Sequence, residues 1–215
     1  MSGKPIIILG INGNCIDIAE AVEAMAQAGA DVRVLGYLDD ADAAQGRMVG
    51  GYPVLGRIAA AADFPNALFV NGIGSTRSFR AKGALIAATG LPEKRWATVI
   101  HPAAFVSRHA QIGHGSVLLA HACVGARARV GPHCMMLQRT LVSHDSVIGG
   151  YGVLASAACV SGGCVIEDNV YLGANSSIRE GLSIGAGALI GMGAVVVKDI
   201  PPGVTAFGNP ACVHP

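Results

Sequence analysis

The sequence predicts an α/β domain followed by a left-handed parallel β-helix, and three observations support this prediction. An aliphatic residue recurs at every sixth position from Val106 to Val196. A small residue usually stands two positions before it, and glycine often follows it directly. Ahead of this run, short aliphatic segments alternate with helical patterns. A period of six fits neither an α-helix nor a half-buried strand, but it fits a solenoid with one short strand and one turn per repeat.

Composition excludes several classes of protein. The chain has 215 residues, of which 52% are hydrophobic and 13% charged. Its apolar runs are far shorter than the roughly 18 residues of a membrane helix, and its first residues do not resemble a signal peptide. We therefore expect a cytoplasmic protein without membrane contact. The net charge of +1 and the lack of a basic run argue against nucleic acid. The six cysteines form no CxxC pair and are expected to be reduced structural thiols.

Residues 1–100 are predicted to form a small Rossmann-like domain. Their strands and helices alternate, which is typical of βαβ units around a parallel sheet. Strands are expected at 5–10, 32–38, 52–55, 67–70 and 97–100, and helices at 15–29 and 78–89.

The turn after the first of these strands is a candidate nucleotide site. A strand, a turn with Gly10 and Gly13, and a helix direct backbone N–H groups to the carboxyl edge of the sheet, where phosphates bind. The turn reads GINGNC rather than GxGxxG, and the acidic pair Asp39-Asp40 after the second strand fits a solvated turn equally well. The residues alone therefore leave nucleotide binding and a plain packing domain both open.

Residues 101–215 are predicted to form the solenoid, with His101-Pro102 at the boundary. Three repeats make one triangular coil, and coils stack about 4.8 Å apart. The aliphatic residues point inward, and the small residues let the chain turn each corner. Because a solenoid needs caps, we expect the N-terminal domain to cover one end. The proline-rich tail from Pro201 to Pro215 is expected to cover the other end or to reach a neighbour.

His144-Asp145 is the candidate catalytic pair, since it places an imidazole beside a carboxylate in the turn after Val142. An ordinary histidine titrates near pH 6.5 and accepts a proton at neutral pH, and a neighbouring carboxylate raises its basicity and orients it. An exposed turn histidine without chemistry is the alternative that the residues alone leave open.

A zinc site is the competing use of the histidines. A catalytic zinc ion needs three protein ligands and an open position. The histidines concerned occupy different phases of the six-residue period, which predicts that they point from different corners. We therefore expect no metal among His109, His114, His121, His133 and His144.

Seven segments spread over nearly the whole chain carry a family resemblance: ILGINGNCIDIAEAV, GYLDD, FVNGIGS, VIHPAAFVS, VSHDSVIG, IGAGALIGMGAVVVKDIPPG and GNPA. With them the chain resembles the hexapeptide-repeat sugar acyltransferases of the sialic acid O-acetyltransferase (NeuD-type) family. That family includes N-acetyltransferases of nucleotide-linked 4-amino-4,6-dideoxy sugars. The resemblance implies an acetyl-CoA-dependent N-acetyltransferase of surface glycan biosynthesis that works as a homotrimer without a metal.

The resemblance also implies roles for particular residues. His144 matches the general base and Asp145 the acidic residue that supports it. Coenzyme A is expected in a groove between adjacent solenoids, lined by Val153, Gly162, Gly173 and Ala174. The nucleotide of the substrate is expected at Gly10, Asn12, Gly13, Asn14, Asp39, Asp40 and Gly74.

Two stretches depart from the family pattern. The family turn usually reads GxGGHA, and Asn14 stands where that pattern has histidine. The stretch 135–140, MMLQRT, lacks the expected small, amide-rich pattern. Three alternatives stay open: a sugar or sialic acid O-acetyltransferase, a zinc-binding solenoid of the γ-type carbonic anhydrase kind, and a non-catalytic scaffold.

Overall fold

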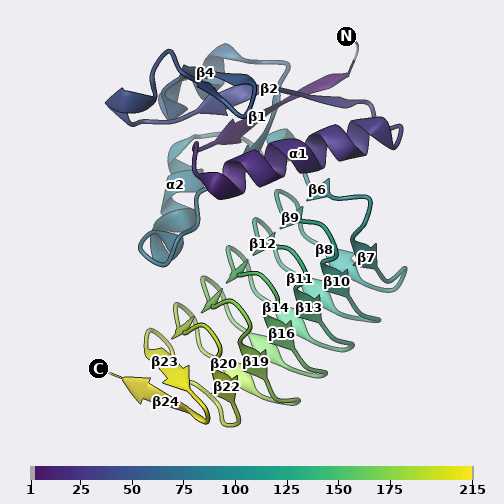
Figure 1. Ribbon diagram of the computed structural model, residues 1–215, viewed down its shortest axis with the longest axis vertical. Coiled ribbons are helices and arrows are strands. Elements are labelled where there is room, and N and C mark those ends of the chain that lie inside the picture. The colour runs from purple at the N-terminus through teal and green to yellow at the C-terminus, as the bar shows by residue number, and fades with distance from the viewer. Residues whose placement is uncertain (1–2, 215) are drawn as a thin grey trace.

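The protein consists of an α/β domain that lies along one side of a long solenoid (Figure 1). This computed structural model describes residues 3–214. Both predicted parts are present in the predicted order, so the fold class is confirmed. No helix within residues 3–214 is long and apolar enough to cross a membrane.

The N-terminal domain is built on one sheet with the strand order β3-β4-β2-β1-β5. β1, β2, β4 and β5 run parallel, and β3 is antiparallel to β4. Aliphatic side chains of β1 such as Ile7 are fully buried, as expected for a central parallel strand. The strands are β1 (Lys4–Leu9), β2 (Val32–Leu38), β3 (Met48–Val49), β4 (Tyr52–Gly56) and β5 (Leu68–Asn71).

Within residues 3–214, two α-helices and four short 3-10 helices connect these strands to one another and to the solenoid. α1 (Gly13–Gln27) begins where the side chain of Asn12 accepts a hydrogen bond from the backbone N–H of Cys15 at 3.3 Å, a typical N-cap. The helix predicted at 78–89 is divided into η3 (Phe79–Ala81) and α2 (Lys82–Ala88). The other short helices are η1 (Asp42–Ala44), η2 (Ile58–Asp63) and η4 (Glu93–Arg95).

The solenoid is made of two-residue strands that recur every six residues. They are β6 (Val99–Ile100), β7 (Phe105–Val106), β8 (Gln111–Ile112), β9 (Val117–Leu118), β10 (Cys123–Val124), β11 (Arg129–Val130), β12 (Met135–Met136), β13 (Leu141–Val142), β14 (Val147–Ile148), β15 (Val153–Leu154), β16 (Cys159–Val160), β17 (Val165–Ile166), β18 (Tyr171–Leu172), β19 (Ser177–Ile178), β20 (Ser183–Ile184), β21 (Leu189–Ile190) and β22 (Val195–Val196).

Every third strand pairs, which gives three sheets around a triangular prism. Sheet I contains β6, β9, β12, β15, β18 and β21, sheet II contains β7, β10, β13, β16, β19 and β22, and sheet III contains β8, β11, β14, β17 and β20. Paired residues such as Cys123 and Leu141 are 18 positions apart, so the predicted coil of 18 residues is confirmed. We name each corner by the sheets it joins: 119–122 lies at the I/II corner, 125–128 at the II/III corner and 131–134 at the III/I corner.

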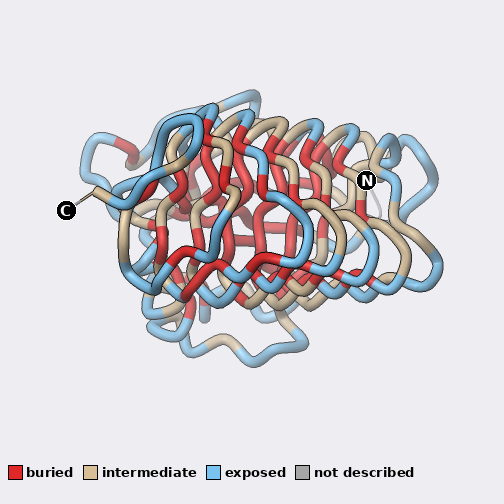
Figure 2. Tube along the Cα trace, turned by 90° about the horizontal axis from the view of Figure 1, so that it is seen from below, coloured by how far each residue is buried: buried red, intermediate tan, exposed pale blue. Residues whose placement is uncertain are grey.

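The interior of the prism follows the predicted pattern. The recurring aliphatic residues form one continuous core, and small residues such as Ser116 and Ala122 are fully buried at the corners. Figure 2 shows this buried strip (red) running through the solenoid, with exposed turns (pale blue) along its edges. The glycines after the aliphatic residues allow coils to stack closely. A Cβ on Gly113 would lie 2.5 Å from the carbonyl carbon of Gly131 in the next coil.

The N-terminal domain covers sheet I rather than an end of the prism. Val117, Met135 and Val153 of sheet I pack in one hydrophobic cluster with Ile18 and Val22 of α1, and Figure 1 shows α1 between the N-terminal sheet and the solenoid. The predicted end cap is therefore replaced by a side-on contact. β6 pairs with β9, so the last strand expected for the N-terminal domain is the first strand of the solenoid.

The C-terminal tail stays on its own solenoid. β23 (Thr205–Gly208) extends sheet I beside β21, and β24 (Ala211–His214) folds back on it as an antiparallel strand. Arg80, in η3, donates hydrogen bonds to the carbonyls of Gly187 at 2.9 Å and Gly203 at 3.3 Å. These contacts tie the last coil to the N-terminal domain.

α2 places a buried lysine against the III/I corner. Lys82 is 2% exposed, and its Nζ has no hydrogen-bond partner within residues 3–214. Burial lowers the pKa of Lys82 to about 8, because desolvation disfavours the ammonium form. His133 lies in the same corner, stacked on Tyr151 with 5.5 Å between ring centroids. Its pKa is lowered to about 4 by burial, with smaller effects from His114 and Lys82.

We expect Lys82→Met to stabilise the protein at pH 7. The folded-state pKa of Lys82 lies below the value of about 10.4 in an unfolded chain, so the folded state binds this proton less well. The stability of the natural protein therefore rises between about pH 8 and pH 10.4. Replacing the buried ammonium should raise the free energy of unfolding by about 1–4 kcal/mol at pH 7, and by less at pH 10. Thermal unfolding at both pH values measures this, with exposed Lys94→Met as the control. A lower melting temperature for Lys82→Met at pH 7 would contradict it.

Candidate active site

The predicted catalytic pair lies in an exposed turn at the II/III corner, between β13 and β14. His144 Nδ1 is 2.8 Å from Asp145 Oδ2. Asp145 has a φ of +62°, a left-handed conformation that a short polar side chain tolerates. Neighbouring coils fix the turn, because the N–H of Asp145 donates to the carbonyl of Ala126 at 3.0 Å and the N–H of Gly163 donates to that of His144 at 3.0 Å. The backbone of the turn that carries His144 is thus held by the coils on both sides.

Arg127 extends the catalytic pair to three hydrogen-bonded side chains, in the order Arg127, Asp145, His144. It stands 18 residues before Asp145, in the preceding coil, and donates from Nε to Oδ1 at 2.6 Å and from a terminal nitrogen to Oδ2 at 2.8 Å. These bonds, and then the one to His144, lower the pKa of Asp145 to about 2. The carboxylate is therefore ionised at neutral pH and accepts the proton of His144 Nδ1. The lone pair of the neutral ring is then on Nε2.

Gly162, in the coil that follows His144, leaves room for the imidazole ring. A Cβ on Gly162 would lie 2.7 Å from His144 Cε1 and 2.9 Å from Nε2. The next residue is again a glycine, Gly163, whose Cβ position meets no atom within 4 Å. The His144 side chain is 67% exposed, and its Nε2 makes no hydrogen bond within residues 3–214. This arrangement lets an external group approach Nε2.

The structure gathers most of the predicted nucleotide-binding residues at the carboxyl edge of β1, β2 and β5. Asn12 Nδ2 donates to the carbonyl of Gly72 at 3.3 Å. Gly10 has a φ of +98°, and a Cβ there would lie 2.8 Å from the side chain of Ile73. Gly13 and Asn14 form the first turn of α1, and Gly13 borders open space. Gly74 is the exception, because it packs against sheet I of the solenoid, with its Cβ position 3.1 Å from Val153 Cγ2.

Asp39 and Asp40 follow β2 at the same edge. Asp39 Oδ1 accepts a hydrogen bond from the N–H of Ala41 at 2.9 Å, and Asp40 Oδ1 accepts one from the N–H of Ile58 at 2.9 Å. Each carboxylate therefore holds a loop, and this role exists without any ligand. A nucleotide role for the pair stays a prediction.

The four residues predicted to line the coenzyme A groove fall in three places. Val153 is 1% exposed and covered by Gly74, whose Cβ position lies 3.1 Å from it. Gly162 supports the His144 ring. Only Gly173 and Ala174 lie together, at the I/II corner, where they line a hollow of about 180 Å³ with Thr76 and Met192. In this chain alone the four residues do not form one groove.

The candidate nucleotide edge and His144 lie on opposite sides of the prism. The N-terminal domain covers sheet I, and the II/III corner is the edge that faces away from sheet I. Both nevertheless lie at the same level along the prism: Asp17 of α1 accepts a hydrogen bond from Gln138 at 3.0 Å, only six residues before His144. A single chain therefore does not bring the two predicted halves of the site together.

The expectation that the histidines point from different corners is wrong for two pairs. His114 and His133 both lie at the III/I corner, with ring centroids 5.0 Å apart, because residues 18 or 19 apart fall in adjacent coils. His109 and His144 share the II/III corner, two coils apart. His114 Nδ1 pairs with Glu93 at 2.9 Å. Within residues 3–214 no group of three or more potential ligands is arranged to hold a metal ion.

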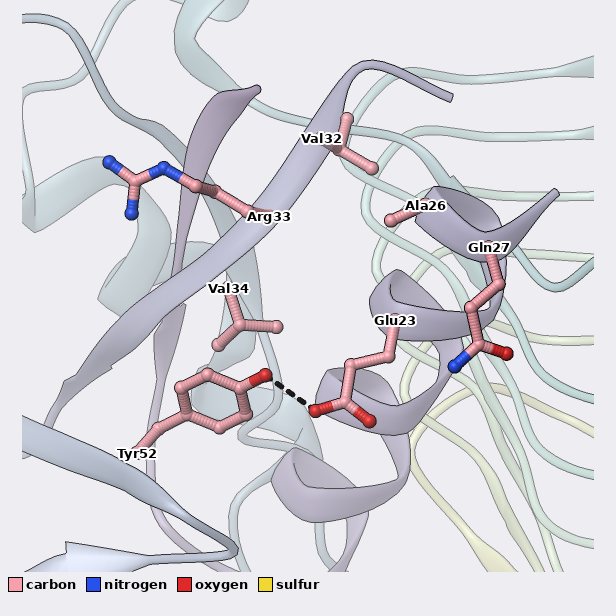
Figure 3. A pocket seen from close by; sticks show the side chains of 7 residues that line it. All are labelled: Glu23, Ala26, Gln27, Val32, Arg33, Val34 and Tyr52. Carbon is pink, nitrogen blue, oxygen red and sulfur yellow. Dashed lines mark hydrogen bonds between the residues drawn. The ribbon is translucent and has the colours of Figure 1, made fainter. Parts of the chain in front are cut away.

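A separate apolar hollow of about 340 Å³ lies between the C-terminal half of α1 and the start of β2. Figure 3 shows Val32, Val34 and Ala26 facing it and the Tyr52 hydroxyl bonded to Glu23, at 2.5 Å. This bond raises the pKa of Tyr52 to about 12. The hollow is at the amino edge of the sheet, whereas Gly10 and Asn12 are at the carboxyl edge, so it is not part of the predicted nucleotide site.

The second half of the solenoid matches a known family of transferases. Residues 163–198 match the family described as bacterial transferase hexapeptide (six repeats). This match confirms the predicted resemblance to the hexapeptide-repeat transferases.

Two solved structures are similar to the chain over almost its whole length. One is the acetyltransferase domain of PglB from Neisseria gonorrhoeae FA1090 in complex with acetyl coenzyme A, with 28% identity, a TM-score of 0.84, and coverage of 99% of this chain and 100% of that one. The other is PerB from Caulobacter crescentus in complex with CoA and GDP-perosamine, with 25% identity, a TM-score of 0.85, and coverage of 98% and 97%.

Curated relatives match a shorter stretch. The GDP-perosamine N-acetyltransferase of Escherichia coli O157:H7 is 33% identical over 119 residues, which are 53% of this chain and 54% of that protein. An acyl-[acyl-carrier-protein]–UDP-N-acetylglucosamine O-acyltransferase of Pseudomonas aeruginosa is 34% identical over 86 residues, 33% of its length. The chain thus spans about half the length of the first relative and a third of the second.

Proposed function

We propose that the protein is an acetyl-CoA-dependent N-acetyltransferase that acts on a nucleotide-linked amino sugar, of the 4-amino-4,6-dideoxy type used in surface glycans. The observation that carries the proposal is the histidine at the II/III corner. The Nδ1 atom of His144 is held by an ionised carboxylate while its Nε2 atom is open to solvent. The similarity to PglB and PerB over nearly the full chain supports the substrate class.

The chemistry needs one proton acceptor and two bound substrates. His144 Nε2 takes a proton from the sugar amine as the nitrogen attacks the thioester carbonyl of acetyl-CoA. A backbone N–H stabilises the oxyanion of the tetrahedral intermediate. When the intermediate collapses, the carbon–sulfur bond breaks and the imidazolium returns the proton to the departing thiolate. Asp145 keeps the ring in one tautomer and stabilises its charged form, as carboxylates do in comparable sites.

In a single chain the nucleotide edge lies on the side of the prism opposite His144. In a homotrimer, a neighbouring copy supplies the nucleotide edge. A rotation about an axis parallel to the prism keeps every residue at its own level, so it can bring the nucleotide turn of one copy beside the His144 of the next. The matching levels of Asp17, Gln138 and His144 favour this assembly. Closed cyclic symmetry is the usual form of such oligomers. A cytoplasmic location is favoured by the six free cysteines.

O-acylation is the second candidate, supported by the similarity to the O-acyltransferase of Pseudomonas aeruginosa. It keeps the fold and the base and changes only the acceptor to a hydroxyl. A neutral amine already has a nucleophilic lone pair, whereas a hydroxyl depends more strongly on the base. The N-acetyltransferase is preferred because the acetyltransferase domain of PglB and the perosamine N-acetyltransferase from Caulobacter crescentus are both similar to nearly the whole chain.

We expect thiol release from acetyl-CoA when the enzyme meets one of a panel of UDP-, GDP- and dTDP-linked 4-amino sugars. Each amino sugar is paired with its 4-hydroxy analogue as a control. Turnover restricted to the amino sugars supports N-acetylation, because only they carry the amine nucleophile. Turnover of the hydroxy analogues at comparable kcat/KM would move the assignment to an O-acetyltransferase.

A further inference from the structure

A polar hollow of about 370 Å³ lies beside the catalytic turn, on its N-terminal side. His109 and Arg127 occupy the same corner position as Asp145 in the two preceding coils. Gln111 and Arg129 are paired residues of β8 and β11 on the outer side of sheet III. The hollow therefore lies between the II/III corner and sheet III, within two coils of His144. All of its lining residues are polar: His109, Gln111, Arg127, Arg129 and Asp145.

The positive charge of this hollow is not balanced. Arg127 is paired with Asp145, but Arg129 is exposed and makes no ion pair within residues 3–214. Arg108 adds a further guanidinium, since its Nε donates to His109 Nε2 at 3.0 Å. The sequence contains no aspartate or glutamate between Glu93 and Asp145, so the first coils supply no other carboxylate. The hollow thus offers cationic donors to an anion.

We propose that this hollow is a subsite for the diphosphate of the nucleotide-linked sugar, with Arg129 as its main ligand. The inference rests on the proposed function, in which both substrates carry a diphosphate. Guanidinium groups bind phosphate oxygens through paired, charge-assisted hydrogen bonds. Gln111 and His109 add polar side chains, so the lining fits a multiply charged oxyanion better than an apolar group.

The position of the hollow favours the sugar nucleotide over coenzyme A. In a nucleotide-linked 4-amino sugar, one hexose ring separates the reacting amine from the diphosphate. Successive coils are about 4.8 Å apart, so a group one or two coils from His144 is within the reach of one ring. In acetyl-CoA the whole pantetheine arm separates the thioester from the diphosphate. That diphosphate therefore belongs farther from His144.

Arg129→Gln tests the subsite. Lys94→Gln is the control, because it also removes one positive charge but does so on η4, at another side of the prism. We expect Arg129→Gln to raise KM for the nucleotide sugar about tenfold or more, the usual effect of losing a charge-assisted hydrogen bond, and to leave KM for acetyl-CoA unchanged. Lys94→Gln should change neither. A rise confined to KM for acetyl-CoA, or no rise in either KM, would overturn the proposal.

A binding measurement separates this proposal from the proposed function. Calorimetry with inorganic pyrophosphate requires no turnover. The natural protein and Lys94→Gln should bind pyrophosphate, and Arg129→Gln should bind it about tenfold more weakly or worse. If no sugar nucleotide of the panel is turned over but this difference is found, the acceptor assignment fails while the anion subsite stands. Equal affinity in all three proteins would refute the subsite, whatever the activity.

Discussion

His144→Asn should lower kcat for acetyl transfer by about 10² to 10⁴-fold, the usual contribution of a general base. The substitution removes the Nε2 atom, which is open to solvent, while Asn keeps a polar side chain of similar reach. The side chain is 67% exposed, so the prism does not depend on it for packing. We therefore expect unchanged thermal stability, unchanged oligomeric mass and unchanged acetyl-CoA affinity by calorimetry. Steady-state thiol release measures kcat.

His121→Asn is the matched control. His121 is another exposed turn histidine, at the I/II corner, with a φ of +62° that Asn tolerates. It makes no contact with Asp145 and should leave kcat unaltered. If His144→Asn retained the natural kcat, the base assignment would be wrong; if both variants lost activity equally, the loss would reflect the turns and not the imidazole.

The solenoid could be predicted closely because its period encodes its geometry. Each aliphatic residue must face the interior once every six positions, so Val106 to Val196 specify strands, corners and the number of residues per coil together. The same logic locates the catalytic turn, since a polar pair such as His144-Asp145 stands out against a wall of small residues. The sequence pattern of one repeat is therefore enough to predict features that depend only on position within the repeat.

Features that depend on the stacking of coils were harder to predict. Two residues 18 apart are neighbours in adjacent coils, and this spacing holds for corner residues as well as for strands. It pairs Arg127 with Asp145 and Gly162 with His144. Nearly the same spacing, 19 residues, places His114 near His133. The outer face of sheet I carries a signal of period 18, because Val117, Met135 and Val153 are all apolar. This signal marks a face to be covered, but it does not identify the N-terminal domain as what covers it.

Gly162→Ala is the prediction that depends most directly on this stacking. The added Cβ would lie 2.7 Å from His144 Cε1 and 2.9 Å from Nε2, closer than such atoms approach, so the ring must turn away. This rotation of the ring breaks the alignment between His144 Nδ1 and Asp145, and it points Nε2 in another direction. Misplacing a catalytic group by about 1 Å costs on the order of 10² in rate. We expect kcat to fall by about that factor, with the fold intact because the exposed ring can move into solvent.

Gly152→Ala is its matched control, because it adds the same methyl group to the same solenoid. A Cβ at Gly152 would meet Ile148 Cγ2 at 3.5 Å, an ordinary contact, and neither kcat nor melting temperature should change appreciably.

The kinetic pattern of Gly162→Ala also distinguishes the two roles available to Gly162. A lower kcat with an unaltered KM for acetyl-CoA supports its role beneath the imidazole. A higher KM for acetyl-CoA with an unaltered kcat would instead support the coenzyme A groove that the family resemblance implies, and would show that the ring tolerates the methyl group without losing its alignment with Asp145.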